Sequence, residues 1–76
     1  MKSKKVYANN IVNDELVEEV KEVVSQQGVA EVYFDVTGRT KNQMLGYQLW
    51  NKLGKDSYDA IIDYDTYDII FSRKQA

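Results

Sequence analysis

Apolar and polar residues recur along the chain with two different periods, one typical of helices and one typical of strands. Residues 14–27 are apolar at every third or fourth position, which predicts an amphipathic helix. Asn13, just before this segment, is a good N-cap residue, and Gly28 suits a left-handed C-terminal cap. Residues 29–36 predict a strand with one buried face and one wet face, because apolar and polar residues alternate from Ala30 to Val36.

The same two periods predict the next elements. Residues 5–12 are expected to form a first strand, and residues 41–53 a second helix with leucines at steps of four. A capping box of Thr40 and Gln43 is expected to begin this second helix, and Gly54 to end it.

The C-terminal part of the chain predicts a β-hairpin. Its two alternating segments, residues 58–64 and 67–72, are separated by the dipeptide Asp-Thr. A two-residue turn at this dipeptide would pair Ile62 with Ile69. Because Asp-Thr is not a favoured turn sequence, a four-residue loop is the alternative, and it gives the same pairing. The predicted fold is α+β: a single small domain of order β-α-β-α-β-β, with two helices packed on one mostly antiparallel sheet.

Size and composition limit what such a chain can be. With 76 residues, residues 1–76 are expected to form one domain, whose core is small enough that we expect a homodimer. Cysteine and histidine are absent, which excludes disulfides, thiolate zinc sites, cysteine nucleophiles and histidine bases. Since neither a signal peptide nor a membrane-spanning segment is evident, we expect a cytoplasmic protein that does not bind membranes.

Charge is segregated along the chain, although the net charge is only −2. Residues 14–35 contain seven acids and one lysine, and residues 56–68 contain five acids and no base. Residues 39–55 contain four bases and no acid. Because like charges on neighbouring positions of a helix or a hairpin repel one another, such blocks are costly unless they have a use. The two acidic blocks are therefore the leading candidates for a functional surface.

The glutamates of the first predicted helix share one face, opposite its apolar positions. A solvated surface is the ordinary explanation, but solvated faces usually interleave lysine with glutamate, and only Lys21 interrupts this row. The row therefore indicates a surface that binds a basic partner. Its members are spaced i, i+3, i+4 and i+7: Glu15, Glu18, Glu19 and Glu22.

The predicted hairpin carries a second acidic group. Asp63 is expected to lie directly opposite Asp68, and facing carboxylates across two strands are destabilising. Protection of an edge strand against aggregation is one explanation, but lysine would serve equally well. We therefore expect a dense negative patch, which consists of Asp59, Asp63, Asp65 and Asp68.

Two other kinds of site are weaker candidates. Asp63, Asp65 and Asp68 could offer oxygen ligands to Mg²⁺ or Ca²⁺, but their spacing is not that of a calcium-binding loop, so no metal or other cofactor is expected. No nucleophile–base pair is evident, which argues against an enzyme. Residues 39–55 combine basic residues with Trp50 and could bind nucleic acid by stacking, which is the alternative function.

The patterns Glu15-x-x-Glu18-Glu19-x-x-Glu22 and Asp59-x-x-x-Asp63-x-Asp65-x-x-Asp68 resemble the carboxylate rows of small phage-encoded proteins that imitate DNA. Similar proteins include Bacillus phage host-takeover proteins that inhibit histone-like nucleoid proteins. The resemblance implies a non-enzymatic inhibitor that binds a basic DNA-binding protein of the host, in the bacterial cytoplasm, without contacting nucleic acid itself. The expected partner-binding residues are the two rows with two acids of the intervening strand: Glu15, Glu18, Glu19, Glu22, Glu31, Asp35, Asp59, Asp63, Asp65 and Asp68.

Overall fold

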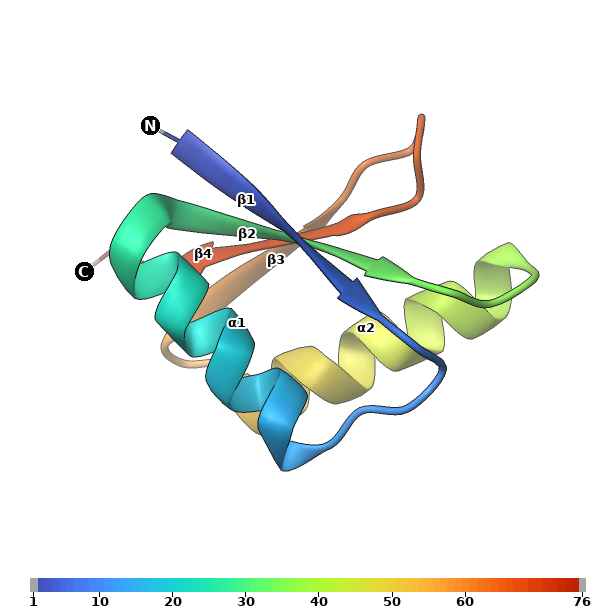
Figure 1. Ribbon diagram of the computed structural model, residues 1–76, viewed down its shortest axis with the longest axis horizontal. Helices are drawn as coiled ribbons and strands as arrows, with labels where there is room; N and C mark the ends of the chain where they lie inside the picture. Colours follow the sequence, from blue (N-terminus) through green and yellow to red (C-terminus); the bar gives the residue numbers. More distant parts are fainter. Residues whose placement is uncertain (1, 76) are drawn as a thin grey trace.

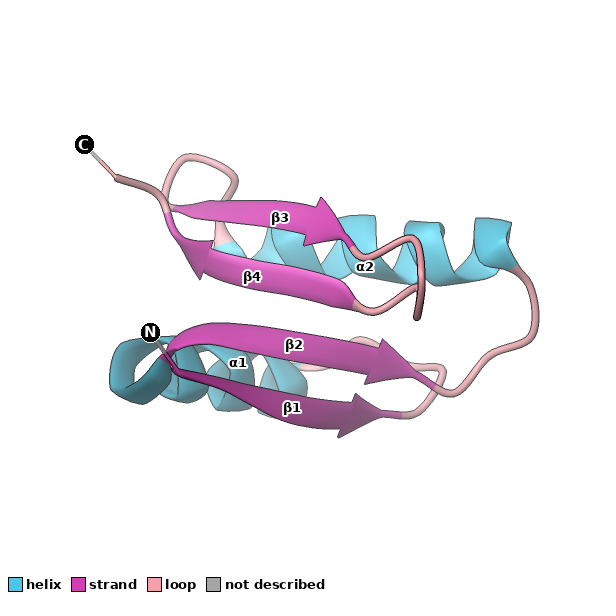
Figure 2. Cartoon of the chain, turned by 90° about the horizontal axis from the view of Figure 1, so that it is seen from above, coloured by secondary structure: helices cyan, strands magenta, loops and turns pink. Residues whose placement is uncertain are grey.

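The computed structural model describes residues 2–75, in which six helices and strands follow one another in the predicted order. The order β-α-β-α-β-β and the α+β class are thereby confirmed. Both helices lie on the same face of one sheet (Figures 1 and 2). The elements are β1 (Lys2–Ala8), α1 (Asp14–Gln27), β2 (Gly28–Phe34), α2 (Arg39–Leu53), β3 (Tyr58–Ile62) and β4 (Ile69–Arg73).

The four strands form a mixed sheet in the order β1-β2-β4-β3. β1 is parallel to β2, whereas β4 is antiparallel to both of its neighbours, β2 and β3. α1 packs mainly against β1 and β2, and α2 packs against β3 and β4 (Figure 2). Within the described residues, β1 and β3 are therefore the edge strands, and the face of the sheet opposite the helices, here called the open face, has no helical cover.

The hydrophobic core fills the space between the helices and the sheet. The five apolar residues of the predicted stripe on α1 are all buried, which confirms the face assigned to this helix. On each strand, every second residue contributes to the core, because successive side chains point to opposite faces of the sheet. The sheet contributes Val6, Ala8, Ala30, Val32, Phe34, Tyr58, Ile69 and Phe71 to the core.

The first strand lies earlier in the chain than predicted. β1 begins at Lys2, which pairs with Gly28, and it ends at Ala8, which pairs with Phe34 at the end of β2. The prediction that the strand reaches residue 12 is wrong, because β2 offers no partner beyond Phe34 and the chain must leave the sheet to start α1. Asn9 and Asn10, which favour turns, lie where it leaves.

α2 also begins earlier than predicted. Gly38, with a φ of 101°, turns the chain into the helix and is its N-cap, and no side chain caps this end. The predicted capping box of Thr40 and Gln43 is therefore wrong. Gly46 brings α2 close to the sheet, since a Cβ at this position would lie 2.8 Å from Cγ1 of Ile69.

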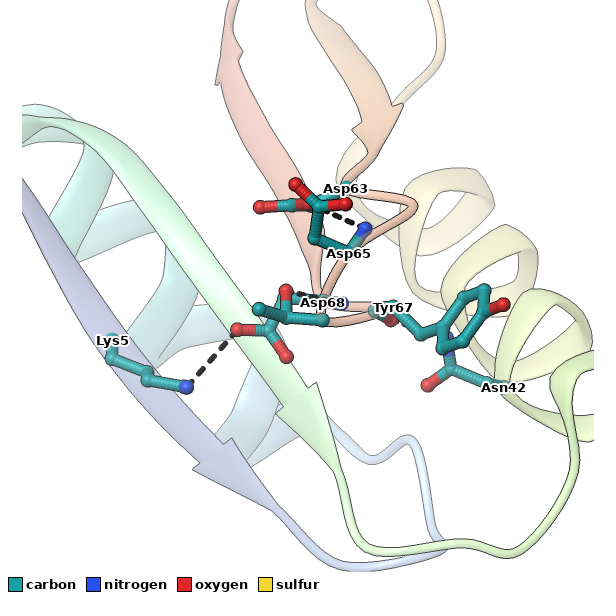
Figure 3. A network of polar contacts seen from close by, with 7 residues as sticks. Lys5, Asn42, Asp63, Asp65, Tyr67 and Asp68 are labelled. Atoms are coloured by element: carbon teal, nitrogen blue, oxygen red, sulfur yellow. Dashed lines mark hydrogen bonds and ion pairs between the residues drawn. The ribbon is translucent and has the colours of Figure 1, made fainter.

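The hairpin has the predicted register, with Ile62 paired to Ile69, and it uses the longer of the two loops. The N–H of Asp63 donates to the carbonyl of Asp68 at 2.9 Å, and the N–H of Tyr67 donates to the carbonyl of Asp63 at 2.6 Å. The two aspartates thus close a four-residue loop, in which Tyr67 has a φ of 63°. The buried side chain of Asn42 donates to the carbonyl of Tyr67 and ties this loop to α2 (Figure 3).

Candidate functional site

The glutamate row of α1 lies on a firmly held helix. Asn13 caps the helix as predicted, because its side-chain oxygen accepts the N–H of Leu16 at 2.9 Å. The five buried apolar residues fix the opposite face against the sheet. The glutamates consequently point away from the core, and all four are exposed: Glu15, Glu18, Glu19 and Glu22.

Little on α1 offsets this negative charge. The helix has five acids and one lysine, a net charge of −4, and no basic residue lies in its last turn. Lys21 Nζ lies 3.8 Å from Glu18 Oε2, and both side chains are largely exposed. An exposed pair of this kind contributes at most about 1 kcal/mol, while like charges at i,i+4 each cost a few tenths. The structure therefore gathers the row on one surface, and Lys21 relieves only part of its repulsion.

The hairpin aspartates do not form the dense patch that the sequence predicted. Asp65 is exposed in the loop, Asp59 and Asp63 are half-buried, and Asp68 is fully buried. Oδ1 of Asp63 accepts the backbone N–H of Asp65 at 2.9 Å, so this carboxylate holds the loop together (Figure 3). The prediction of a four-aspartate surface is wrong because Asp68 is buried and the Asp63 carboxylate binds the backbone of the loop.

Asp68 is paired with a lysine from a distant strand. Its Oδ2 lies 3.1 Å from Nζ of Lys5 on β1, so that the pair reaches across β2 (Figure 3). The Asp68 side chain is 1% exposed and the Lys5 side chain 39% exposed. The Asp68 carboxylate raises the pKa of Lys5. The assignment of Asp68 to the partner-binding surface is wrong, and so is the interpretation of Asp63 and Asp68 as an uncompensated repulsive pair.

Glu31 on β2 completes this cluster on the open face. It is opposite Lys5 in the register and is half-buried. The neighbouring Asp68 carboxylate raises the pKa of Glu31, and burial raises it further, although Lys5 opposes the change. Glu31 therefore belongs to a cluster that joins β1, β2 and the start of β4. Asp35 lies apart from this cluster, exposed just beyond the end of β2.

Two tyrosines on the open face were not among the predicted site residues. Tyr7 and Tyr33 are partners in the register of β1 and β2, and their rings meet edge to face with centroids 5.9 Å apart. Nζ of Lys5 lies 5.7 and 5.6 Å from the two ring centroids. Tyr7 is 73% exposed. The strand alternation could have identified them, since both tyrosines occupy positions of the wet face.

The basic region 39–55 does not present Trp50 as a free stacking surface. The indole N–H of Trp50 donates to the carbonyl of Tyr58 at 2.6 Å, and its ring packs edge to face on Tyr47. Nζ of Lys55 lies 3.8 Å from the Tyr47 ring centroid and 5.4 Å from that of Trp50. Through these contacts, Trp50 holds the beginning of β3 against α2.

Comparisons with protein-family models, with curated proteins and with solved structures gave no match to this chain. Among residues 2–75, no three acidic side chains come close enough together to hold a metal ion. In the same part of the chain, neither helix is long and apolar enough to cross a membrane. Of the two predicted acidic groups, the glutamate row of α1 is the one whose members all lie exposed on one surface.

We predict that Asp68→Asn lowers the free energy of unfolding by about 1–3 kcal/mol, because it removes the counter-charge of Lys5 and places an amide at a buried position. Urea denaturation near pH 7 measures this change. Asp65→Asn is the matched control, since it removes the same charge from an exposed side chain and should change stability by about 0.5 kcal/mol or less. Equally small effects for both variants would contradict the structural role of Asp68.

The raised pKa of Glu31 predicts a pH dependence of stability. Since the folded protein binds this proton more tightly than the unfolded chain, the stabilisation is complete below the ordinary pKa of glutamate and is lost as the pH rises through the raised pKa. Glu31→Gln stays neutral throughout, so its stability relative to wild type should increase between about pH 4 and pH 7. Urea denaturation across this range is the test. A difference that does not change with pH would contradict the assignment.

Proposed function

We propose that this protein is a non-enzymatic inhibitor that uses the exposed glutamate row of α1 to occupy the DNA-binding surface of a basic, histone-like protein. The observation that carries the proposal is the gathering of Glu15, Glu18, Glu19 and Glu22 on one exposed helix face. The single lysine among them, Lys21, leaves the helix with a net charge of −4.

The charge density of this row supports the comparison with DNA. Glu22 lies seven positions after Glu15, and a helix rises about 1.5 Å per residue, so the four carboxylates lie along roughly 10 Å of helix axis. One strand of duplex DNA has a phosphate every ~3.4 Å. Lysine and arginine form charge-assisted hydrogen bonds with carboxylates as they do with phosphates. A basic groove could therefore accept this helix face in place of a DNA strand.

The rigidity of α1 also favours binding. Asn13 caps the helix, and the buried apolar face holds it on the sheet, so the backbone that carries the glutamates is already ordered before any partner arrives. A preordered surface loses less conformational entropy on binding. Because the attraction is electrostatic, association should be fast and should weaken as salt is added.

The proposal restricts the binding surface to α1. Asp59 and Asp63 occupy positions of the strand alternation that face away from the helices, so they do not extend the row. Asp68 and Glu31 take part in the cluster with Lys5. The surface is therefore one helix face, not the pair of acidic rows expected from the sequence.

The test is a titration in which the protein displaces labelled DNA from a histone-like protein at low and high salt. Glu18→Gln combined with Glu22→Gln should raise the concentration needed for half displacement about 3- to 30-fold at low salt, and by less at high salt. The free energy of unfolding should stay the same or rise, since like-charge repulsion on the helix is reduced.

Asp56→Asn combined with Asp65→Asn is the matched control, because it removes two charges from exposed positions outside α1. This control should displace DNA almost as well as wild type. Lys21→Gln should improve displacement, since it makes the row more negative. Equal weakening by both double variants, or no displacement by wild type, would refute the proposal.

A further inference from the structure

The edge strand β3 carries backbone groups without a partner. Asp63 donates its N–H to Asp68 on the other side of the hairpin, so position 63 faces β4. In an antiparallel pair, residues that bond across the ladder alternate with residues whose N–H and C=O point outward. Ala60 and Ile62 therefore point their backbone groups outward, and among residues 2–75 no backbone group bonds to them from that side.

The beginning of this edge is closed by neighbouring groups. Trp50 donates its indole N–H to the carbonyl of Tyr58, and the N–H of Tyr58 donates to the carbonyl of Gly54 at 3.0 Å. The backbone of Tyr58 is thus already satisfied on the outward side. The open stretch is limited to Ala60–Ile62, which fits a short added strand.

An apolar groove lies beside the open stretch, on the helix side of the sheet. It has a volume of about 350 Å³ and lies between α2 and β3. Side chains of a strand added to β3 would alternate between this groove and the open face. The groove could therefore receive every second side chain of an incoming segment. Its principal lining residues are Gly46, Tyr47, Trp50, Ala60, Ile62 and Tyr64.

The open-face side of β3 adds a charge preference. Ile61 is 62% exposed and lies between the half-buried Asp59 and Asp63. Residues 56–68 contain five acids and no base, so the edge lacks the lysines that commonly protect edge strands. In an added strand, basic side chains would therefore be favourable opposite the two aspartates. An apolar side chain would be favourable opposite Ile61.

We propose that β3 binds an extended segment of a partner protein by strand addition, and that this segment has three apolar residues between two basic ones. The apolar residues would pair with Ala60–Ile62, and the basic residues would face Asp59 and Asp63. The β3 edge lies in the half of the sheet away from α1, so this site does not depend on the glutamate row.

Pairing between the β3 strands of two copies fits this surface less well. An antiparallel pair centred on Ile61 would match Ala60 of each copy with Ile62 of the other. The same register would set Asp59 of each copy opposite Asp63 of the other, and facing carboxylates destabilise a strand pair. The charge of the edge therefore favours a basic partner segment over a second copy.

The test uses the synthetic peptide acetyl-Lys-Val-Ile-Val-Lys-amide and the ¹⁵N-labelled full chain, followed by NMR. Binding should shift the amide signals of residues 60–62 and 46–50 and slow hydrogen exchange at Ala60 and Ile62. The peptide acetyl-Glu-Val-Ile-Val-Glu-amide should bind at least about tenfold more weakly, because its charges meet Asp59 and Asp63.

Two variants separate strand addition from other modes of binding. Ala60→Pro removes one outward N–H without removing a hydrogen bond of the hairpin, and it should weaken peptide binding about tenfold or more. Asp59→Asn combined with Asp63→Asn should also weaken peptide binding, because it removes both negative charges from the edge. Asparagine at position 63 keeps a side-chain oxygen that can accept the N–H of Asp65 and hold the loop. Equal binding of both peptides or unchanged binding by Ala60→Pro would overturn the proposal. So would concentration-dependent shifts at β3 without peptide, which would indicate a second copy.

Discussion

Both helices of this protein lie on one face of its four-stranded sheet, which leaves the other face to be stabilised by the side chains of the strands themselves (Figure 2). Residues of one parity on the strands form the core with α1 and α2, and those of the other parity must be accommodated in contact with water. On the open face they form a cluster in which Lys5 is ion-paired with Asp68 and Glu31 lies opposite Lys5, beside the rings of Tyr7 and Tyr33. The open face is thus stabilised by charge pairing and aromatic contacts.

The strand order turns the segregation of charge along the sequence into segregation in space. α1 covers the β1–β2 half, so its glutamates face away from the sheet on that side. The acidic hairpin forms the other half and ends in the uncovered edge of β3. We therefore infer two separate surfaces for basic partners, a helix face that offers charge alone and a strand edge that offers charge with backbone hydrogen bonds and an apolar groove.

Features that depend on local sequence could be predicted, and features that depend on strand order could not. α1 follows from its period and the Asn13 cap, and the hairpin register follows from alternation in its two strands. The role of Asp68 depends on the position of β1 beyond β2, which brings Lys5 within reach. From the hairpin sequence alone, the Asp68 carboxylate is therefore expected to have no counter-charge. The start of α2 was missed because Gly38 caps it through backbone conformation, without a side-chain bond.

Mapping the complex by NMR tests directly whether the glutamate row of α1 is the contact surface. A histone-like protein is added at low salt to the ¹⁵N-labelled chain, and amide signals are followed. We predict that the largest shifts fall on the exposed positions of α1, between Asn13 and Gln26, while signals around Lys5, Glu31 and Asp68 stay in place. Shifts centred on the open face or on residues 39–55, with α1 unaffected, would show that the glutamate row is not the contact surface.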